Sequence, residues 1–422
     1  MKEDFLHYVW QNKKFDFAHL KTTQGESLQI IHSGNYIQQT GPDFFNAQLI
    51  IENQKWAGNI EIHIKSSDWY LHHHEIDQNY DNVILHVVWE NDISVLRKNN
   101  VEIPVLELKH CVSRDLVHQY QKLKTKKNWI NCENDIAGIQ QFVFKNWQER
   151  LFFERLERKS YPVLELLQEN NNDWEVVLFC FLAKNFGLNV NGEIFFQLAK
   201  ELPFSVVRKE SFDVTYLEAL FFGHANLLPQ NAQDSYSKDL IDLYDYLSVK
   251  YKLEKKFLSS PEFFRLRPDN FPTIRLAQLA MLYHKHRNLF SKVFEAKTIE
   301  EFYKLFDISV SDYWQSHYNF EKKSTPKEKG LSKSFIDLLL INTILPIKMA
   351  YSKFLGTEID ERMIYLLEQL KPEKNAVIDK FKEIGVRVEN SFESQSLLQL
   401  KNEYCSKNKC LQCAVGITLL KN

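Results

Sequence analysis

Two patterns of apolar and polar positions divide this chain. Up to about residue 112, apolar residues alternate with polar ones or form short unbroken runs, as strands do. From about residue 113 to 400 they recur at helical spacing, for example at Trp147, Leu151 and Leu156. We therefore predict an α/β N-terminal domain with a mixed sheet, followed by a larger all-α domain.

The N-terminal part is predicted to contain one short helix and several strands. An unbroken apolar run such as Val83–Trp89 indicates a strand that is covered on both faces. The polar stretch Trp69–Asn82 before it is expected to be partly helical. The other elements expected here are a helix at Phe5–Trp10 and strands at Ser27–His32, Ala47–Glu52, Gly58–Lys65 and Val101–Leu108.

Helices are expected throughout the second part of the chain, before a C-terminal cysteine tail. The domain boundaries that we predict give residues 1–112 to the α/β domain and 113–400 to the helical domain. Residues 401–422 would form a metal-binding tail that packs back on the helical domain. The clearest helical segments are Trp174–Phe186, Leu217–Leu228, Ile274–His284 and Ser334–Phe354.

Composition narrows the class of protein. Hydrophobic residues make up 44% of the 422 residues, and a formal net charge of −2 argues against a globally basic nucleic-acid binder. The start Met1–Asp4 is too acidic for a signal peptide. The most apolar run, Phe335–Ile347, is interrupted by polar residues and is shorter than the ~20 residues that a membrane span needs. We expect a soluble, cytoplasmic protein that does not bind membranes.

The most informative segment for chemistry is residues 41–86. Because alternate side chains of a strand share a face, Glu61, His63 and Lys65 are expected together, opposite a row of isoleucines. The turn that ends in Asp43 supplies a second carboxylate. Two carboxylates suit Mg²⁺ or Mn²⁺, which would activate water for phosphodiester hydrolysis with His63 or Lys65 assisting. In the alternative interpretation, Asp43 only closes a turn, and Glu61 and His63 are surface residues.

Histidines crowd the same segment. His72 and His74 follow the strand, and His86 lies in the next one. Imidazole suits Zn, Mn or Fe, so these histidines are candidates for a transition-metal site or for contacts with a substrate phosphate. The alternative is a polar helix start, with His86 satisfied in the core.

Three cysteines, Cys405, Cys410 and Cys413, fall within nine residues near the C-terminus. Clustered thiols favour a metal in a reducing compartment, and both zinc and a 4Fe–4S cluster require a fourth ligand. We expect Cys132 to be that ligand, with Cys111 as the second choice. The alternative is a set of unliganded surface thiols.

Three arginines surround two prolines in the helical part. Arg265, Arg267 and Arg275 are expected to bind nucleic-acid phosphates near a helix start. Alternatively, they pair with acids such as Glu262 and Asp269 and fix a corner of the fold.

The order of elements around Asp43 and Glu61 resembles that of the PD-(D/E)XK nuclease superfamily over about residues 25–110. The resemblance implies a restriction-endonuclease-like sheet in which both acids bind metal and a lysine two residues after the second acid assists. Here that position holds His63, so Lys65 or His63 itself would act, or the site would be inactive. The cysteines look like the iron–sulfur staple of one exonuclease branch, although Cys132 follows the nuclease motifs instead of preceding them.

Motifs along nearly the whole chain resemble an uncharacterised bacterial family, domain-of-unknown-function family 2851. The resemblance implies a cytosolic bacterial protein and brings no activity with it. The motifs are Gly41-Pro42-Asp43-Phe44, Gly58-Asn59-Ile60-Glu61-Ile62-His63, Ser67-Asp68-Trp69 with His72 and His74, Val83–Val88, Arg267-Pro268 with Asn270-Phe271-Pro272, and Tyr404-Cys405 with Cys410 and Cys413.

We carry two main hypotheses for function. In the first, the protein is a Mg- or Mn-dependent nuclease that uses Asp43 and Glu61, with a structural 4Fe–4S cluster or zinc. In the second, it is a non-catalytic module that binds nucleic acid or protein through an inactive nuclease-like core. A metallohydrolase that uses the histidines on a small phosphorylated substrate is the third.

Overall fold

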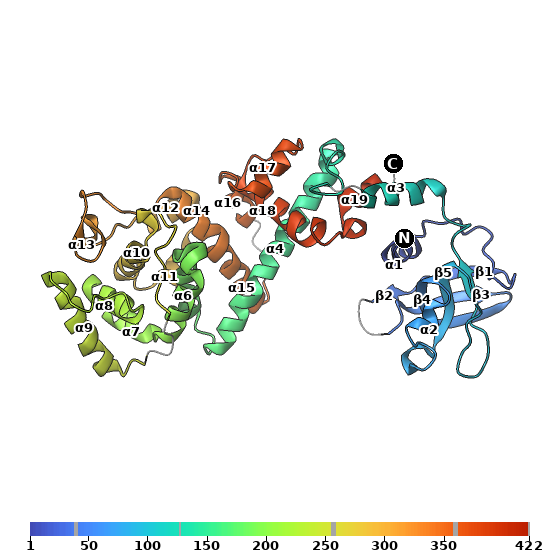
Figure 1. The fold of residues 1–422 in the computed structure, drawn as a ribbon, viewed down its shortest axis with the longest axis horizontal. Coiled ribbons are helices and arrows are strands. Elements are labelled where there is room, and N and C mark those ends of the chain that lie inside the picture. Colours follow the sequence, from blue (N-terminus) through green and yellow to red (C-terminus); the bar gives the residue numbers. More distant parts are fainter. Residues whose placement is uncertain (38–40, 126–127, 255–258, 358–361, 421–422) are drawn as a thin grey trace. The chain divides into compact units, whose positions relative to one another are not determined.

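The computed structural model describes the chain except residues 38–40, 126–127, 255–258, 358–361 and 421–422 (Figure 1). Contacts divide it into two compact units. The N-terminal unit comprises Met1–Gln148, Asp379–Arg387 and Leu398–Asn422, and the helical unit comprises Glu149–Ile378 and Val388–Leu397. A mixed sheet in the N-terminal region and a larger, mostly helical region confirm the coarse prediction of the fold. The units divide the chain at other residues than the boundaries that we predict.

The described part of the N-terminal unit contains a six-stranded mixed sheet (Figure 1). Neighbours β1–β3 and β3–β4 are antiparallel, whereas β4–β5 and β5–β6 are parallel. Strand β4 therefore lies inside the sheet, where antiparallel pairing changes to parallel pairing. The strands in spatial order are β1 (Leu28–His32), β3 (Phe44–Ile51), β4 (Gln54–Lys65), β5 (Val83–Glu90) and β6 (Val105–Glu107), and β2 (Asn35–Tyr36) pairs with β3.

Alternation along β4 sorts its two faces. Ile60 and Ile62 join one apolar cluster with the buried side of the first helix, α1 (Glu3–Gln11). Glu61 and His63 alternate with these isoleucines and so project from the other face, and Glu61 pairs in register with His86 of β5. All side chains of β4 from residue 60 to 63 are buried.

Short helices complete the N-terminal unit around the sheet. The C-terminal tail belongs here, because Leu420 lies in the same apolar cluster as α1. These helices are α2 (Asp68–Leu71), η1 (Gln78–Tyr80), α3 (Arg114–Thr125), η2 (Ile136–Gly138), the π-helix η5 (Leu400–Cys405), η6 (Cys410–Gln412) and α19 (Ala414–Leu419).

The helical unit is a packed set of helices with a small hairpin. In it, α5 packs against α6, and α8 packs against both α9 and α10. Its elements, with α4, α17 and α18 shared with the N-terminal unit, are α4 (Gln141–Glu169), α5 (Trp174–Phe186), α6 (Leu188–Glu201), α7 (Phe204–Glu210), α8 (Val214–His224), α9 (Ser235–Tyr251), η3 (Pro268–Asn270), α10 (Pro272–Lys285), α11 (Leu289–Glu295), α12 (Ile299–Leu305), α13 (Asp312–Gln315), β7 (His317–Asn319), β8 (Lys322–Lys323), α14 (Lys333–Leu339), the π-helix η4 (Leu340–Ile344), α15 (Leu345–Leu355), α16 (Arg362–Glu368), α17 (Ala376–Glu383) and α18 (Ser391–Gln399).

One continuous helical stretch of this unit, Lys333–Leu355, is long and apolar enough to cross a membrane by length and composition. However, 61% of its most apolar window is buried inside the protein. This helical stretch therefore packs in the core of the helical unit.

Strands β4 and β5 approach each other closely at Gly58. A Cβ atom on Gly58 would lie 2.5 Å from the carbonyl oxygen of Asn82 and 2.5 Å from Cγ2 of Ile84. The absence of a side chain lets the neighbouring Asn59 N–H donate to that carbonyl at 2.9 Å. Glycine thus permits the start of the parallel pairing that carries the site.

Replacing Gly58 by alanine is expected to lower the free energy of unfolding of the N-terminal unit by about 1–3 kcal/mol, because the added methyl overpacks this contact. Urea denaturation followed by tryptophan fluorescence measures the change. Gly138→Ala is the matched control, since nothing lies within 4 Å of a Cβ there. Equal unfolding midpoints for the two variants would contradict this account of the β4–β5 pairing.

Candidate metal centre

Asp43, which directly precedes β3, lies next to Glu61 in the paired strand β4. The backbone N–H of Asp43 donates to Glu61 Oε2 at 3.1 Å, and the N–H of Ile62 donates to Asp43 Oδ2 at 3.0 Å. The turn before Asp43 depends on Gly41, whose φ of +111° is rarely adopted by residues with a side chain. The sequence analysis pairs the same two acids.

A bulge follows Asp43 in the strand. The pairing of β3 with β4 shifts register between Phe44 and Ala47, and Asn46 in between has a φ of +57°. Bulges of this kind bend a strand and redirect its side chains, and they recur next to functional sites. Here the bulge lies directly after the residue that approaches Glu61.

Three histidines converge near Glu61. Glu61 Oε1 lies 3.4 Å from His63 Nε2 and 3.3 Å from His74 Nε2. His63 Nε2 also lies 3.2 Å from Nδ1 of His72. One ring nitrogen from each of the three histidines lies within 4.8 Å of the other two. His72 is exposed whereas the other two histidines are buried, so the group is open to solvent on one side.

The turn after α2 brings His72 and His74 back over β4. The His72 N–H donates to the Asp68 carbonyl at 2.9 Å, and the His74 N–H donates to the Trp69 carbonyl at 3.0 Å. The His74 ring stacks on Tyr80, with 3.8 Å between ring centroids. Local backbone bonds and aromatic packing thus fix both rings.

His86 orients the central histidine. Its Nε2 lies 2.8 Å from His63 Nδ1, and its side chain is fully buried. If the proton of this bond is on His63 Nδ1, the lone pair of His63 Nε2 is directed at Glu61 and His72. Metal-binding histidines are commonly held in this way, with the second ring nitrogen donating to a buried acceptor.

Burial controls the charge of these groups. Burial, reinforced by Asp43, raises the pKa of Glu61 to about 9. Burial, reinforced by His86 and His74, lowers the pKa of His63 to about 2. The pKa of His74 is also lowered, mainly by burial. At neutral pH the buried imidazoles are therefore in the uncharged form that binds metals, whereas Glu61 holds a proton unless a cation replaces it.

The donor spacing fits one transition-metal ion. Ligand bonds of about 2.0–2.1 Å separate neighbouring donors of a tetrahedral site by about 3.3 Å. The closest donor pairs here are 3.2, 3.3 and 3.4 Å apart. His74 Nε2 is also buried without a hydrogen-bond partner among the described residues, and a bound cation would satisfy it. His63, His72, His74 and Glu61 would hold the ion, and three imidazoles favour Mn, Fe or Zn over Mg.

Helix α1 adds two groups that sequence reasoning missed. His7 Nε2 lies 3.1 Å from Asp43 Oδ2. Burial lowers the pKa of His7, but the contact with Asp43 outweighs it, so that the pKa is raised overall. Glu3 lies one turn earlier, and burial raises its pKa. The i, i+4 spacing of Glu3 and His7 was the sequence signal that could have identified them, but such a pair is common on exposed helix faces.

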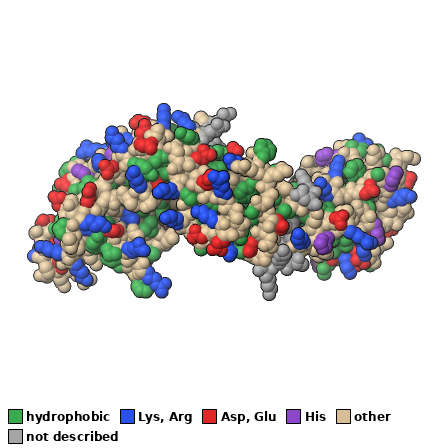
Figure 2. Space-filling view, turned by 90° about the horizontal axis from the view of Figure 1, so that it is seen from above, with side chains coloured by type: hydrophobic (Ala, Val, Ile, Leu, Met, Phe, Trp, Pro, Cys, Tyr) green, Lys and Arg blue, Asp and Glu red, His purple; other side chains and the backbone are tan. Residues whose placement is uncertain are grey.

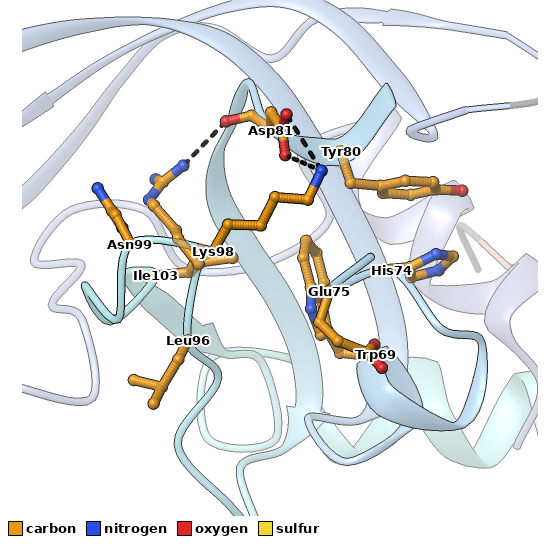
Figure 3. A pocket seen from close by; sticks show the side chains of 10 residues that line it. Trp69, His74, Glu75, Tyr80, Asp81, Leu96, Lys98, Asn99 and Ile103 are labelled. Carbon is orange, nitrogen blue, oxygen red and sulfur yellow. Dashed lines mark hydrogen bonds and ion pairs between the residues drawn. The ribbon is translucent and has the colours of Figure 1, made fainter. Parts of the chain in front are cut away.

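A pocket of about 220 Å³ opens beside His74 (Figure 3). Trp69, His74 and Tyr80 line it together with the cations Arg97 and Lys98. In Figure 3 Lys98 reaches over the pocket to the carboxylate of Asp81, a contact of 3.1 Å. Aromatic faces and cations therefore meet next to the histidines. Figure 2 shows several histidines at the surface of the N-terminal unit, among interspersed basic and acidic side chains.

Lys65 does not join this group. Its Nζ lies 3.9 Å from Asp92, and 54% of its side chain is exposed. As the last residue of β4, it lies beyond the buried part of the strand. His63 is therefore the basic residue in contact with Glu61.

The three arginines of the helical unit have different surroundings. Arg275 is only 7% exposed, and its guanidinium donates to Asn270 at 2.6 Å and to Gln278 at 3.0 Å. Helix packing encloses Arg275, and its binding of substrate stays a prediction. Arg265 and Arg267 are exposed, and their binding of phosphate stays a prediction.

The four cysteines that the sequence analysis groups line a common pocket. Cys132 meets Cys405, Cys410 and Cys413 there, within the N-terminal unit. Cys111 lies outside this pocket, with its thiol 3.7 Å from the Glu107 carbonyl.

Comparison with known proteins gives one family. The family model described as "Protein of unknown function (DUF2851)" matches residues 3–376. No curated protein and no solved structure was found to match. Activity must therefore be argued from the site.

We expect the protein to bind Mn²⁺ at the histidines. The His74→Ala variant is expected to bind Mn²⁺ at least about tenfold more weakly, because changes to groups that only support metal ligands already cost about that much affinity. The measurement is titration followed by the EPR signal of free Mn²⁺, an ion that thiolates bind poorly.

The matched control is His73→Asn in the same turn. The His73 side chain is 76% exposed, and asparagine tolerates its φ of +61°. Equal Mn²⁺ affinity of the His74→Ala variant and the wild type would rule out the centre.

Proposed function

Because the chain belongs to the family of proteins of unknown function DUF2851, whose description gives no activity, we propose from the site alone that the protein is a metal-dependent phosphodiester hydrolase with a nuclease-like core. The observation that carries this proposal is the metal-sized spacing of His63, His72, His74 and Glu61 beside a second carboxylate, Asp43. Nucleic acid is the substrate class that we propose.

The order of elements supports the nuclease-like part of the proposal. A strand (β1), a Pro-Asp turn, a hairpin strand with acid-x-base (β4), a short helix (α2) and a parallel strand (β5) follow one another. This is the order on which the resemblance to PD-(D/E)XK nucleases is based. A restriction-endonuclease-like sheet is therefore our proposal for the N-terminal unit, with His63 at the lysine position.

The residues of the site have different roles in the proposed hydrolysis. His63, His72, His74 and Glu61 would hold the ion, which when bound polarises a phosphoryl oxygen and lowers the pKa of a water molecule. Asp43 is oriented by the Ile62 N–H and by His7.

Asp43 is therefore positioned to accept the proton of the attacking water. The water oxygen bonds to phosphorus as the ester bond to the leaving oxygen breaks. His7, whose ring contacts Asp43, can donate a proton to the leaving oxygen.

The donor set changes the metal that we expect. Mg²⁺ prefers oxygen ligands, whereas a group of three imidazoles and one carboxylate suits Mn²⁺ or Zn²⁺. Of the two ions predicted from the sequence, Mn²⁺ is the better match.

The pocket beside His74 supports a nucleotide-containing substrate. Bases stack on aromatic faces, and Arg and Lys attract phosphates, so Tyr80, Arg97 and Lys98 are of the kinds that bind single-stranded nucleic acid, whereas the buried Trp69 forms the apolar wall behind them. The pocket shares His74 with the metal centre, which puts a bound nucleotide next to the scissile phosphate.

A non-catalytic binding module is the second candidate. The observation that favours it is His63, a buried and uncharged side chain where the nuclease pattern has a lysine. Such a module would keep the pocket beside His74 and bind nucleic acid without cutting it.

We expect Mn²⁺-dependent cleavage of DNA or RNA, and a loss of at least about 100-fold in Glu61→Gln and Asp43→Asn, since metal-assisted charge stabilisation is worth several kcal/mol. Single- and double-stranded substrates and a small aryl phosphodiester are assayed in parallel.

Glu90→Gln is the control, because Glu90 ends β5 with a half-exposed side chain 3.6 Å from Lys109. Binding of nucleic acid without cleavage by the wild type would favour the module. Cleavage of the small diester alone would favour a small phosphorylated substrate.

A further inference from the structure

A second group of metal-binding side chains lies in the N-terminal unit, apart from the histidines. Cys132 precedes α4, whereas Cys405, Cys410 and Cys413 belong to the C-terminal tail, and all four line one pocket. None of them forms a disulfide. Folding has thus gathered four free thiols from segments that are far apart in the sequence.

The backbone of the tail is shaped around these thiols. Cys405 ends the π-helix η5, a rare helix type that is frequent at functional sites. Asn408, with a φ of +52°, turns the chain toward Cys410. A Cβ on Gly416 would overlap the Cys410 carbonyl oxygen, so only glycine lets α19 fold back this tightly.

Hydrogen-bond donors are directed at the sulfur atoms. Asn131 Nδ2 donates to Cys410 Sγ at 3.3 Å. The backbone N–H groups of Gly416 and Val415 donate to the Cys413 sulfur. Donors directed at sulfur favour the thiolate, which is the form of cysteine that binds iron or zinc.

The spacing of the sulfur atoms distinguishes a zinc ion from an iron–sulfur cluster. Among the described residues, the donor atoms close enough for one ion are those of His63, His72 and His74, within 4.8 Å, and the cysteine sulfurs form no such group. Tetrahedral zinc, with Zn–S bonds of about 2.3 Å, needs its sulfurs about 3.8 Å apart. A 4Fe–4S cluster places one thiolate on each of its four iron atoms and so needs a wider set of ligands.

We propose that Cys132, Cys405, Cys410 and Cys413 bind a 4Fe–4S cluster that ties the C-terminal tail to the segment before α4. The cluster is independent of the proposed hydrolase activity. Its role is structural: the same tail supplies Leu420 to the apolar cluster of α1 and the sheet. Residues from both ends of the chain would thereby be held in one unit.

The test is the analysis of iron, zinc and acid-labile sulfide in the full-length protein purified without oxygen. We expect about four irons and four sulfides per chain and a broad absorption in the violet-blue. Sulfide distinguishes the cluster from iron at the histidines. One zinc per chain without sulfide, or a metal-free protein, would overturn the proposal.

Variants identify the ligands. Cys132→Ser and Cys410→Ser are expected to lose iron, sulfide and colour together, whereas Cys111→Ser, outside the pocket, keeps them. Full cluster content in Cys132→Ser would contradict the ligand set. If a serine variant does not fold, the wild-type iron and sulfide content still decides the proposal, and no activity assay enters the result.

Discussion

Residues 60–63 of strand β4 are buried on both faces, and the structure around them depends on this constraint. The isoleucines of this segment pack against α1. On the opposite face, Glu61 is only 5% exposed and His63 only 1% exposed. Polar groups removed from water destabilise a fold unless hydrogen bonds or ions compensate them. The compensation here comes from Asp43, His72, His74 and His86, and a bound cation would complete it.

Two inorganic centres are proposed for one unit, and α1 lies between the elements that carry them. It packs against β4 on the sheet and contacts η6 of the cysteine tail. His7 on α1 touches Asp43, whereas Phe5 and Val9 fill the apolar cluster shared with Leu420. Helix α1 therefore packs against both the tail and the residues around Asp43.

The sequence predicted well what depends on local pattern. Alternation along Gly58–Lys65 identified the strand and the shared face of Glu61 and His63, and the turn residues before Asp43 identified the approach of the second acid, but the burial of both faces was not predicted. The chemistry of thiols called for a fourth ligand beside the three tail cysteines, and Cys132 was chosen over Cys111 because it opens the helical domain.

What the sequence did not reveal depends on packing between distant segments. The contact of His7 with Asp43 requires the position of α1 over the sheet. The burial of Arg275 requires the neighbours of α10, since a charged residue near a helix start otherwise suggests a phosphate site. The tail belongs to the N-terminal unit through the packing of apolar residues such as Ile417 and Leu420, which carry no distinguishing pattern in the sequence.

The most direct test of the central claim is a crystal structure of the protein soaked in Mn²⁺, with anomalous differences recorded at the manganese edge. The account predicts an anomalous peak bonded to His63, His72 and His74, with Glu61 as a further ligand. A site without such a peak, in which Glu61 only hydrogen-bonds to the histidines, would contradict it.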